Sequence, residues 1–399
     1  MTDMLPLPQG FRTVGLACGI KSDPTKLDLA LFVADKPCAA AGVFTQNLVC
    51  GAPVKVSRER LPSGRARAIV INSGNANACT GPRGLEDARL MTEHVAAQLD
   101  CTSDDVLVCS TGIIGHYLPM EKLTAGITEA ATKLDDTPQA FANSATAIMT
   151  TDTHHKQAMR EAEIDGVTVR VAGAAKGAAM IGPNMATMLA VVMTDADLSP
   201  EDADAMLRHA VDRSFNCISV EGHTSTSDSV LLLASGASGV VPSQSDSAKK
   251  TLQSMLDEVT EELATAIVGD AEGASHFITI DVRGLRTRAE AHRIAKTVAD
   301  GALVKTAVTG NDPNWGRIVS AVGYAGVELT EEDISLSIND IRIYEAGAPV
   351  EHDAAAVSTS MGTGHVHIEL DLTLGDAAVR FWTCDLTTEY VRLNSEYTT

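Results

Sequence analysis

One segment of the chain, between Lys176 and Thr187, combines residue types that indicate a definite reaction. It reads Lys-Gly-Ala-Ala-Met-Ile-Gly-Pro-Asn-Met-Ala-Thr, a single cation followed by small and uncharged residues up to a threonine. A threonine whose preceding peptide bond is broken offers its hydroxyl as nucleophile and its own α-amine as base, since that amine has a pKa of about 7.7–8.0. Gly177 and Gly182 would let the backbone adopt the strained conformation that an N-to-O acyl shift needs. Taken alone, however, such a string is more typical of a turn that leads into a strand.

Longer strings decide between these two interpretations. The run from Lys176 to Leu189 closely resembles the self-cleavage signature of the ornithine acetyltransferase family, the glutamate N-acetyltransferases of arginine biosynthesis. The resemblance covers essentially the whole chain. Its other matching strings, in order, are Gly10-Phe11, Gly19-Ile-Lys21, Phe44-Thr45, Ala52-Pro-Val54, Asn72-Ser-Gly-Asn-Ala-Asn77, Cys109-Ser-Thr-Gly112, Thr150-Thr-Asp-Thr153, Ser219-Val-Glu-Gly222, Gly269-Asp-Ala-Glu-Gly-Ala274, Gly310-Asn-Asp-Pro-Asn-Trp-Gly-Arg317, Cys384-Asp-Leu-Thr387 and Asn394-Ser-Glu-Tyr-Thr-Thr399. Each string is weak by itself, and their shared register makes the resemblance specific.

The resemblance implies an activity. The precursor would cleave itself between Ala186 and Thr187, and the new Thr187 would take the acetyl group of N-acetylornithine as an ester. Ornithine would leave, and the amine of glutamate would then accept the acetyl group, which is ping-pong covalent catalysis. Some members of the family also acetylate glutamate from acetyl-CoA, and no residue in this sequence distinguishes the two kinds. No metal or organic cofactor is implied.

The resemblance also implies how the reaction's negative charge is stabilised. Thr111 and Gly112 would donate hydrogen bonds, from a hydroxyl and a backbone N–H, to the oxyanion of each tetrahedral step. The residues themselves agree, because Thr-Gly after the apolar stretch 105–109 can form a loop of donors. Without the family, a Thr-Gly pair is more typical of a simple turn.

The implied substrate contacts are Thr153, Lys176, Thr187, Glu272, Asn394 and Thr399. Lys176 is the natural partner of the substrate's α-carboxylate. We assign Glu272 to the side-chain ammonium of ornithine. Because Glu272 would repel the side-chain carboxylate of glutamate, a site that accepts both substrates needs a compensating contact.

The sequence departs from the family pattern at a few positions. Ala179 stands where glycine is usual, which would slow self-cleavage if that position requires a positive φ. His223 and Ser227 replace the usual Asp and Asn, and His154-His155 replaces a more apolar pair. None of these changes removes a residue with an assigned role.

The elements that must position these residues alternate between strand-like and helix-like patterns. We expect strands at 68–72, 105–109, 167–171, 187–193, 229–233, 276–282, 335–338, 365–372 and 378–383. We expect helices at 86–99, 138–149, 199–213, 248–268 and 290–300. These patterns predict an α+β protein. The resemblance adds the layering, in which helices sandwich two stacked sheets as in N-terminal-nucleophile architectures. Residues 1–186 and 187–399 would be the two pieces of one cleaved fold, and the family suggests a dimer of cleaved pairs.

Composition excludes several other classes of protein. The chain has 399 residues with 31 Lys and Arg against 52 Asp and Glu, a net charge of −21. This balance argues against binding to nucleic acid or to anionic lipid. No apolar run reaches the about 18 residues of a membrane helix, and the N-terminus lacks a secretory pattern. The eight cysteines form no CxxC pair, so we expect reduced thiols and a cytoplasmic protein.

The same residues leave other functions open beside the transferase. A self-cleaving aminopeptidase or amidase would follow the same plan, with water in the place of glutamate. An uncleaved member would act as a binding or scaffold protein. His365, His367 and Glu369 alternate along one strand and could hold a metal, but three residues along a straight strand converge poorly on one ion, which favours a plain surface face.

Overall fold

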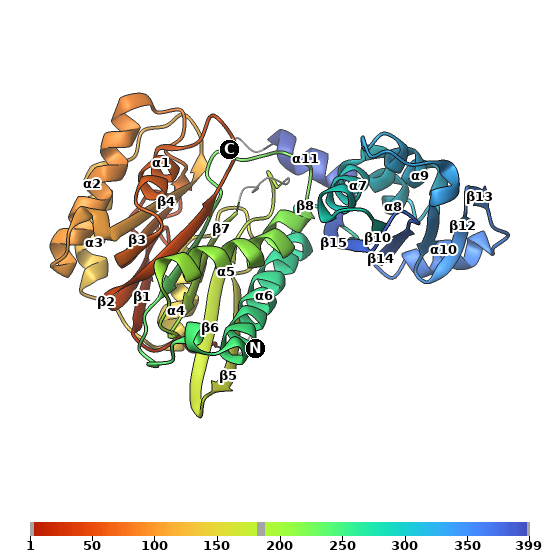
Figure 1. Ribbon diagram of the computed structural model, residues 1–399. Helices are drawn as coiled ribbons and strands as arrows, with labels where there is room; N and C mark the ends of the chain where they lie inside the picture. The colour runs from red at the N-terminus through yellow and green to blue at the C-terminus, as the bar shows by residue number, and fades with distance from the viewer. Residues whose placement is uncertain (1–3, 182–187, 397–399) are drawn as a thin grey trace.

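The computed structural model describes residues 4–181 and 188–396 of the chain. Ala186, Thr187 and Thr399, to which the sequence assigns cleavage, nucleophile and substrate roles, therefore lie outside the described residues, as does Gly182. The described chain forms two units (Figure 1). The larger unit contains most elements up to α6, and the smaller unit contains those from β10 to β15.

Eight strands of the larger unit form one sheet, in which the long strand β2 has different partners along its length. The order is β4-β3-β2-β9-β7-β6-β5, with β1 paired to β2. Residues 29–33 of β2 pair with β1 and β3, whereas residues 39–44 pair with β9. The strands are β1 (Phe11–Leu16), β2 (Leu29–Phe44), β3 (Ser63–Asn75), β4 (Val106–Ile113), β5 (Lys156–Ile164), β6 (Val167–Lys176), β7 (Leu189–Thr194) and β9 (Ser229–Ala234).

The alternation of buried side chains shows that this sheet is folded into two stacked layers. Leu189, Val191 and Met193 of β7 belong to the same apolar cluster as Phe32 of β2 and Ile71 of β3. The cluster lies between the layer β1–β4 and the layer β5–β7 with β9. The residues in between on β7 face the opposite way, into the cluster that holds α5 and α6. A strand buried on both faces is apolar throughout, as the sequence at 187–193 predicted.

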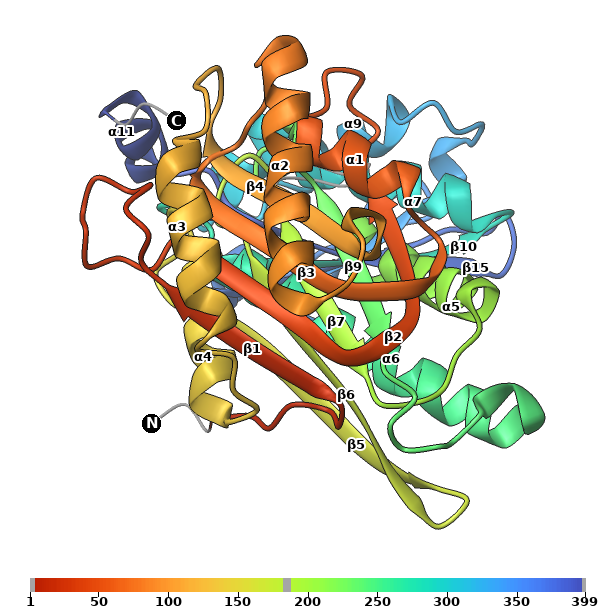
Figure 2. The same ribbon diagram turned by 90° about the vertical axis from the view of Figure 1, so that its left-hand side faces the viewer.

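Helices cover both outer faces of these layers. α2 and α3 lie over β1–β4 (Figure 2), and α5 and α6 lie over the other layer. The helices are α1 (Ala52–Glu59), α2 (Gly81–Leu99), α3 (Met120–Ala131), α4 (Pro138–Ala147), α5 (Pro200–Arg213) and α6 (Asp246–Gly269). Ser199 caps α5, because its side chain accepts the N–H of Asp202. The predicted sandwich of helices around two stacked sheets is confirmed for the larger unit.

The smaller unit, which that prediction did not include, has a second sheet of order β13-β12-β11-β14-β10-β15-β8. Its strands are β8 (Ile218–Ser219), β10 (Phe277–Leu285), β11 (Ser335–Ile338), β12 (Ile341–Glu345), β13 (Ala348–Pro349), β14 (His365–Asp371) and β15 (Ala377–Cys384). Its helices are α7 (Arg288–Asp300), α8 (Ala302–Thr309), α9 (Trp315–Gly323) and α10 (Ala354–Met361), and α11 (Thr388–Glu396) follows. Residues of its sheet join the same apolar cluster as α5 and α6, so the two units share a core.

Most predicted elements are present, with ends that differ by a few residues. β2 was missed because the exposed residues 35–37 and a shift of register interrupt its apolar pattern. All eight cysteines lie in the described part of the chain and are free, four of them buried. Among the described residues, no helix combines the length and apolar character that crossing a membrane demands.

Candidate active site

Five of the predicted site residues line one cavity of about 400 Å³. They are Thr111, Gly112, Lys176, Glu272 and Asn394. They come from the end of β4, the end of β6, the loop after α6, and α11. A larger, more open groove of about 940 Å³ lies between residues 42–50 and α5, and it contains none of the predicted residues.

Thr111 and Gly112 belong to the end of β4, and not to a loop after it as the sequence predicted, and they lie against the end of the neighbouring strand. β3 and β4 run parallel, with Thr111 opposite Ser73 and Gly112 opposite Gly74. Gly112 has a φ of +129°, and a Cβ there would lie 2.4 Å from the carbonyl carbon of Gly74. Only glycine fits this approach, so the backbone at the end of β4 is fixed beside the cavity.

Lys176 connects the end of β4 to β7, the strand that follows Thr187 in the chain. Its Nζ lies 3.4 Å from Oγ1 of Thr111, and the side chain is buried. A hydroxyl that accepts from an ammonium keeps its own hydrogen free to donate, so Thr111 remains a donor for an oxyanion. Lys176 is also paired with Leu189 in the β6–β7 ladder, which places the start of β7 beside it. Burial lowers the pKa of Lys176, and the Asp152 carboxylate opposes that effect.

Beneath Lys176 lies a buried ionic network that the sequence analysis did not identify. Lys156 donates to Asp152 over 2.7 Å and to Asp270 over 2.6 Å. Asp152 also accepts the N–H of Gly177 over 2.6 Å. Burial alone would raise the pKa of Asp152, but the ammonium groups of Lys176 and Lys156 and these hydrogen bonds lower it to about 2. The network therefore carries a fixed negative charge that faces Lys176.

Thr153, a predicted substrate contact, belongs to this network. Its backbone N–H donates to Asp270 over 3.0 Å, and its hydroxyl donates to the same carboxylate. Thr153 lies beside the cavity, whereas its neighbours Thr150 and Thr151 line it. The available signal for this network in the sequence was Asp152, an acidic residue within the string Thr150-Thr-Asp-Thr153.

Asp228 is a second buried carboxyl that the sequence analysis did not identify. It accepts the backbone N–H of Met188 over 3.1 Å and is fully buried. Burial raises the pKa of Asp228 well above its ordinary value, which favours the protonated form. The preceding Ser225, Thr226 and Ser227 line the cavity. An acidic residue just before the apolar stretch 229–233 was the available signal.

The far wall of the cavity is built by Glu272 and the C-terminal helix. Nδ2 of Asn394 donates to Oε2 of Glu272 over 3.1 Å, and the N–H of Glu272 donates to the carbonyl of Ala178 over 3.0 Å. Gly273 has a φ of +68°, and a Cβ there would lie 2.5 Å from the backbone nitrogen of Tyr390. This close packing fixes α11 beside the cavity.

Ala179 lies in the cavity wall without the backbone strain that the sequence raised as a concern. The positive φ angles in this stretch belong to Gly177 (+153°) and Met180 (+59°), and not to Ala179. Alanine in place of glycine therefore adds no left-handed strain at this position. His154 and His223 are exposed, as befits surface substitutions.

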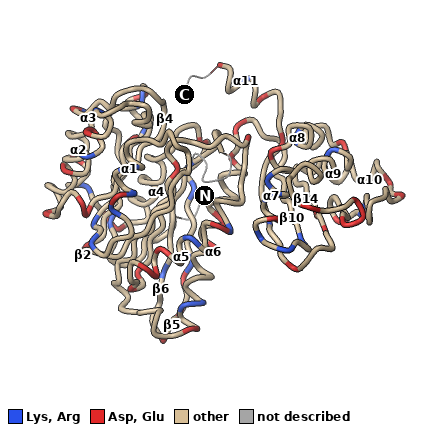
Figure 3. The backbone as a smooth tube through the Cα atoms, turned by 45° about the horizontal axis from the view of Figure 1, so that its top comes forward, with Lys and Arg blue, Asp and Glu red and all other residues tan. Residues whose placement is uncertain are grey.

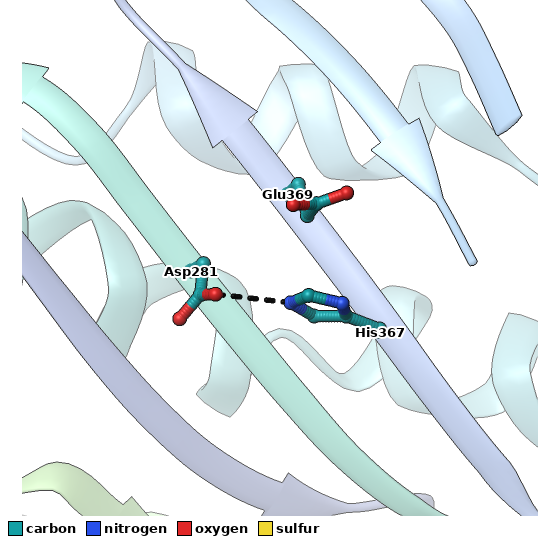
Figure 4. A group of neighbouring side chains, drawn as sticks. All are labelled: Asp281, His367 and Glu369. Carbon is teal, nitrogen blue, oxygen red and sulfur yellow. Dashed lines mark hydrogen bonds and ion pairs between the residues drawn. The ribbon is translucent and has the colours of Figure 1, made fainter. Parts of the chain in front are cut away.

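The face of β14 that carries His365, His367 and Glu369 lies beside an acidic residue of the neighbouring strand β10. His367 and Glu369 on β14 lie beside Asp281 on β10, and ligand atoms of the three lie within 4.8 Å of one another (Figure 4). His365 begins the same face of β14 and is exposed. The distance between Nε2 of His367 and Oδ2 of Asp281 is 3.1 Å.

Guanidinium groups already neutralise the carboxylates of this cluster. Arg380 donates twice to Asp281, over 2.8 and 2.9 Å. Arg283 donates to Asp281 over 2.9 Å and to Glu369 over 3.3 Å. Carboxylate oxygens bonded to arginine are poor metal ligands, so this arrangement favours the surface ionic face that the sequence predicted.

Comparisons with known proteins identify the chain's relatives. The sequence profile of the ArgJ family matches residues 12–399. The chain is 46% identical to "Arginine biosynthesis bifunctional protein ArgJ" of Rhodopirellula baltica, over 100% of both chains. It is 44% identical to the protein of the same name from Geobacter sulfurreducens, over 98% of this chain and 99% of that one. It is 41% identical to a crystallised chain of ornithine acetyltransferase from Mycobacterium tuberculosis, in complex with ornithine, over 46% of this chain and 96% of that one, with a TM-score of 0.42.

Proposed function

The chain belongs to the ArgJ family and exchanges an acetyl group between ornithine and glutamate; we propose that Thr187 carries this group as an ester, after self-cleavage between Ala186 and Thr187. One observation supports the proposal above all. The cavity holds Thr111 within 3.4 Å of Lys176, and Lys176 is paired with Leu189, two residues after Thr187 in the chain. The strand that begins after the proposed nucleophile is thus anchored at the proposed oxyanion donors.

The proposed reaction is a double displacement. The hydroxyl oxygen of Thr187 attacks the acetyl carbonyl of N-acetylornithine, and the α-amine of Thr187 takes the hydroxyl proton. The C–N bond then breaks, the proton passes to the leaving amine, and ornithine departs. The amine of glutamate attacks the ester carbon and gives a proton to the α-amine of Thr187. The C–O bond to Thr187 then breaks, that proton passes to the Thr187 oxygen, and N-acetylglutamate is released.

Each tetrahedral intermediate carries its negative charge on the former carbonyl oxygen. Thr111 donates its hydroxyl and Gly112 its backbone N–H to that oxygen in the proposed mechanism. Lys176 adds a buried positive charge next to Thr111, where the low dielectric strengthens it. Removal of one donor of this kind typically costs about 10²–10³ in kcat.

Substrate recognition is proposed to use both walls of the cavity. Lys176 binds the α-carboxylate, and Glu272, held by Asn394, binds the side-chain ammonium of ornithine. Thr153, which donates to Asp270, and Thr399, which lies outside the described residues, are the other proposed substrate contacts. Comparing KM values in Glu272→Gln tests this assignment. A larger effect on N-acetylornithine than on glutamate is expected, and an equal effect on both would reject it.

The experiment that tests the proposed chemistry compares the wild type with Thr187→Ala. Intact-mass measurement should show two fragments for the wild type and one full-length chain for Thr187→Ala. Incubating the wild type with acetyl-labelled N-acetylornithine should add about 42 Da plus the mass of the isotope label to the fragment that begins with Thr187, because an acetyl group replaces a hydrogen. Cleavage of the Thr187→Ala chain, or label on another residue, would refute the proposal.

The same experiment separates the transferase from a hydrolase. In the absence of glutamate, labelled acetate should appear far more slowly than N-acetylglutamate does in its presence. Release of acetate at the full rate without glutamate would favour the aminopeptidase or amidase alternative. A wild-type chain that stays uncleaved would favour the scaffold alternative.

Donor, assembly and compartment complete the proposal. Both curated relatives are named bifunctional, so we propose acetyl-CoA as a second acetyl donor for glutamate. An assay with acetyl-CoA as the only donor tests this. We further propose that two cleaved pairs associate as a dimer and that the enzyme works in the cytoplasm.

A further inference from the structure

The proposed site still lacks a partner for one charged group. One cavity must accept the side-chain ammonium of ornithine and the side-chain carboxylate of glutamate, and only the ammonium has an assigned residue. The charged residues that line the cavity are Lys21, Lys26, Lys176, Asp23 and Glu272. Positive groups therefore outnumber negative ones. Two of the lysines, 21 and 26, have no role in the mechanism given above.

Lys21 is the better placed of these two lysines. It is partly buried, whereas Lys26 is exposed. Its Nζ donates to the carbonyl of Leu27 over 2.7 Å and to the carbonyl of Met149 over 2.8 Å. Among the residues that the structure describes, no carboxylate lies within 4.0 Å of this ammonium. Lys21 thus keeps an uncompensated charge and a third N–H.

The loop that carries Lys21 is fixed by a buried carboxylate. Asp28 is inaccessible to solvent and accepts the backbone N–H groups of Cys18, Gly19, Ile20 and Lys21 over 2.7 to 3.1 Å. Lys21 is therefore held at both ends, by Asp28 at its backbone and by two carbonyls at its ammonium. A charge that is positioned before the ligand arrives costs little reorganisation when it binds.

The charges of the two substrates match this arrangement. N-acetylornithine carries one carboxylate and one side-chain ammonium, for which Lys176 and Glu272 suffice. Glutamate carries two carboxylates, and Lys176 can neutralise only one of them. Lys21 and Lys176 line the same cavity. A dicarboxylate can span two such cations.

From this geometry we propose that Lys21 is the specificity-determining residue that binds the side-chain carboxylate of glutamate. The inference rests on the proposed function of the cavity and deepens it, since it gives the two acceptable side chains separate partners. Glu272 selects the donor's ammonium, and Lys21 selects the acceptor's carboxylate. The site accepts both substrates because each side chain turns toward its own wall.

Calorimetry on the mature enzyme tests the proposal without relying on turnover. Lys21→Met should weaken glutamate binding by about 10- to 100-fold, as expected for a charge-assisted hydrogen bond. Ornithine binding should change less than threefold. The preference for glutamate over glutamine should also collapse, because glutamine lacks the carboxylate. Lys21→Arg should restore part of the glutamate affinity.

Lys122→Met is the matched control. Lys122 donates to the carbonyl of Gly19 over 2.7 Å, on the same loop, but it is exposed and is not among the residues lining the cavity. It removes the same charge nearby and should leave both affinities within twofold. Equal weakening of glutamate and ornithine in Lys21→Met would mean that Lys21 only supports the loop, and would overturn the proposal. Unchanged glutamate affinity would overturn it as well.

A transfer assay then distinguishes failure of this inference from failure of the proposed function. Acetyl-enzyme should form from N-acetylornithine at a similar rate in Lys21→Met and the wild type, and its decay should require more glutamate in the variant. If the wild type forms no acetyl-enzyme while glutamate binding still depends on Lys21, the proposed mechanism fails and the Lys21 assignment stands. If acetyl-enzyme forms and its decay is insensitive to Lys21, only the assignment fails.

Discussion

At the scale of single residues, the chemistry of the cavity depends on how its lysines are held. Lys176 is buried, and the negative charge of Asp152 offsets part of the cost of burying its ammonium group. Lys21 has carbonyl partners instead and keeps its charge available. The two lysines therefore have different proposed tasks: Lys176 binds the α-carboxylate beside the proposed oxyanion donor Thr111, and Lys21 binds the side-chain carboxylate of glutamate.

Thr111→Val tests the oxyanion donor. The change keeps the shape of the side chain and removes the hydroxyl that Lys176 contacts. We expect kcat to fall by about 10²- to 10³-fold with KM for N-acetylornithine little changed, because the donor acts mainly on charge that develops in the transition state. Steady-state kinetics measure this, and Thr111→Ser should retain most of the activity. A loss confined to KM would assign Thr111 to ground-state binding.

The pH dependence of glutamate binding tests Lys21 in a different way. Burial lowers the pKa of Lys21 to about 8, with Lys26 and Lys176 acting in the same direction and Asp28 and Asp152 opposing them. The residue is charged below that pH and neutral above it, so KM for glutamate should rise as pH increases through about 8. Arginine stays charged, so Lys21→Arg should lose this rise. The same rise in Lys21→Arg would trace it to another group, such as a reacting amine.

At the scale of elements, the site is made where strand ends meet. β4, β6 and β7 bring Thr111, Lys176 and the residues after Thr187 together, while the loop after α6 and helix α11 close the far side. The Lys156 ion pairs tie β5 to the end of α6. These ion pairs are buried, so they hold the start of β5 and the end of α6 at a fixed distance.

Asp228 is expected to hold the beginning of β7. Asp228→Ala leaves the Met188 N–H without its acceptor in a buried place, which should lower the free energy of unfolding by about 1–3 kcal/mol. Self-cleavage should slow as well, because Met188, which follows Thr187 directly in the chain, loses the hydrogen bond that holds it. Asp228→Asn can still accept the N–H and resembles the protonated acid, so it should behave nearly as the wild type. Urea unfolding and a time course on a denaturing gel measure both effects. An Asn variant as impaired as the Ala variant would indicate that the proton of Asp228 itself takes part.

At the scale of the whole molecule, the two proposed fragments are interleaved. β7 begins the second fragment and pairs with β6 of the first, and β9 pairs with β2 in the same sheet. Ladders that cross between the fragments in this way should keep them together after cleavage. Acidic residues occur along the backbone of both units (Figure 3).

The fragments should nevertheless separate sharply once unfolded. Residues 1–186 contain 17 Lys and Arg against 19 Asp and Glu, a net −2, whereas residues 187–399 contain 14 against 33, a net −19. Isoelectric focusing in urea should therefore give one band near neutral pH and one strongly acidic band. Focusing without denaturant should give a single band. Two bands under native conditions would show that the cleaved pieces dissociate.

Part of the fold could be predicted from the sequence because the signals are local. The apolar run after Thr187 predicted a strand buried on both faces, and Ser199 with the acidic residues after it predicted the start of α5; both predictions are confirmed from Leu189 onward. Several strands and a helix of the smaller unit were predicted, but their assembly into a second sheet was not, because it depends on contacts between distant segments. Strand β2 was missed because exposed residues interrupt its apolar pattern.

The sequence by itself determined the residue types of the reaction: a Lys-to-Thr string with small residues, a Thr-Gly pair, and a strongly acidic second piece. Only the tertiary structure decided which side chains share one cavity. Lys176 lies 65 residues from Thr111, and Met149 lies 128 residues from the lysine it fixes. Asp28 and Asp228 look like ordinary acids in the sequence, and burial gives them their roles. The physical reason is that hydrophobic periodicity acts over a few residues, whereas the register of a sheet and the burial of a charge are set by packing across the whole chain.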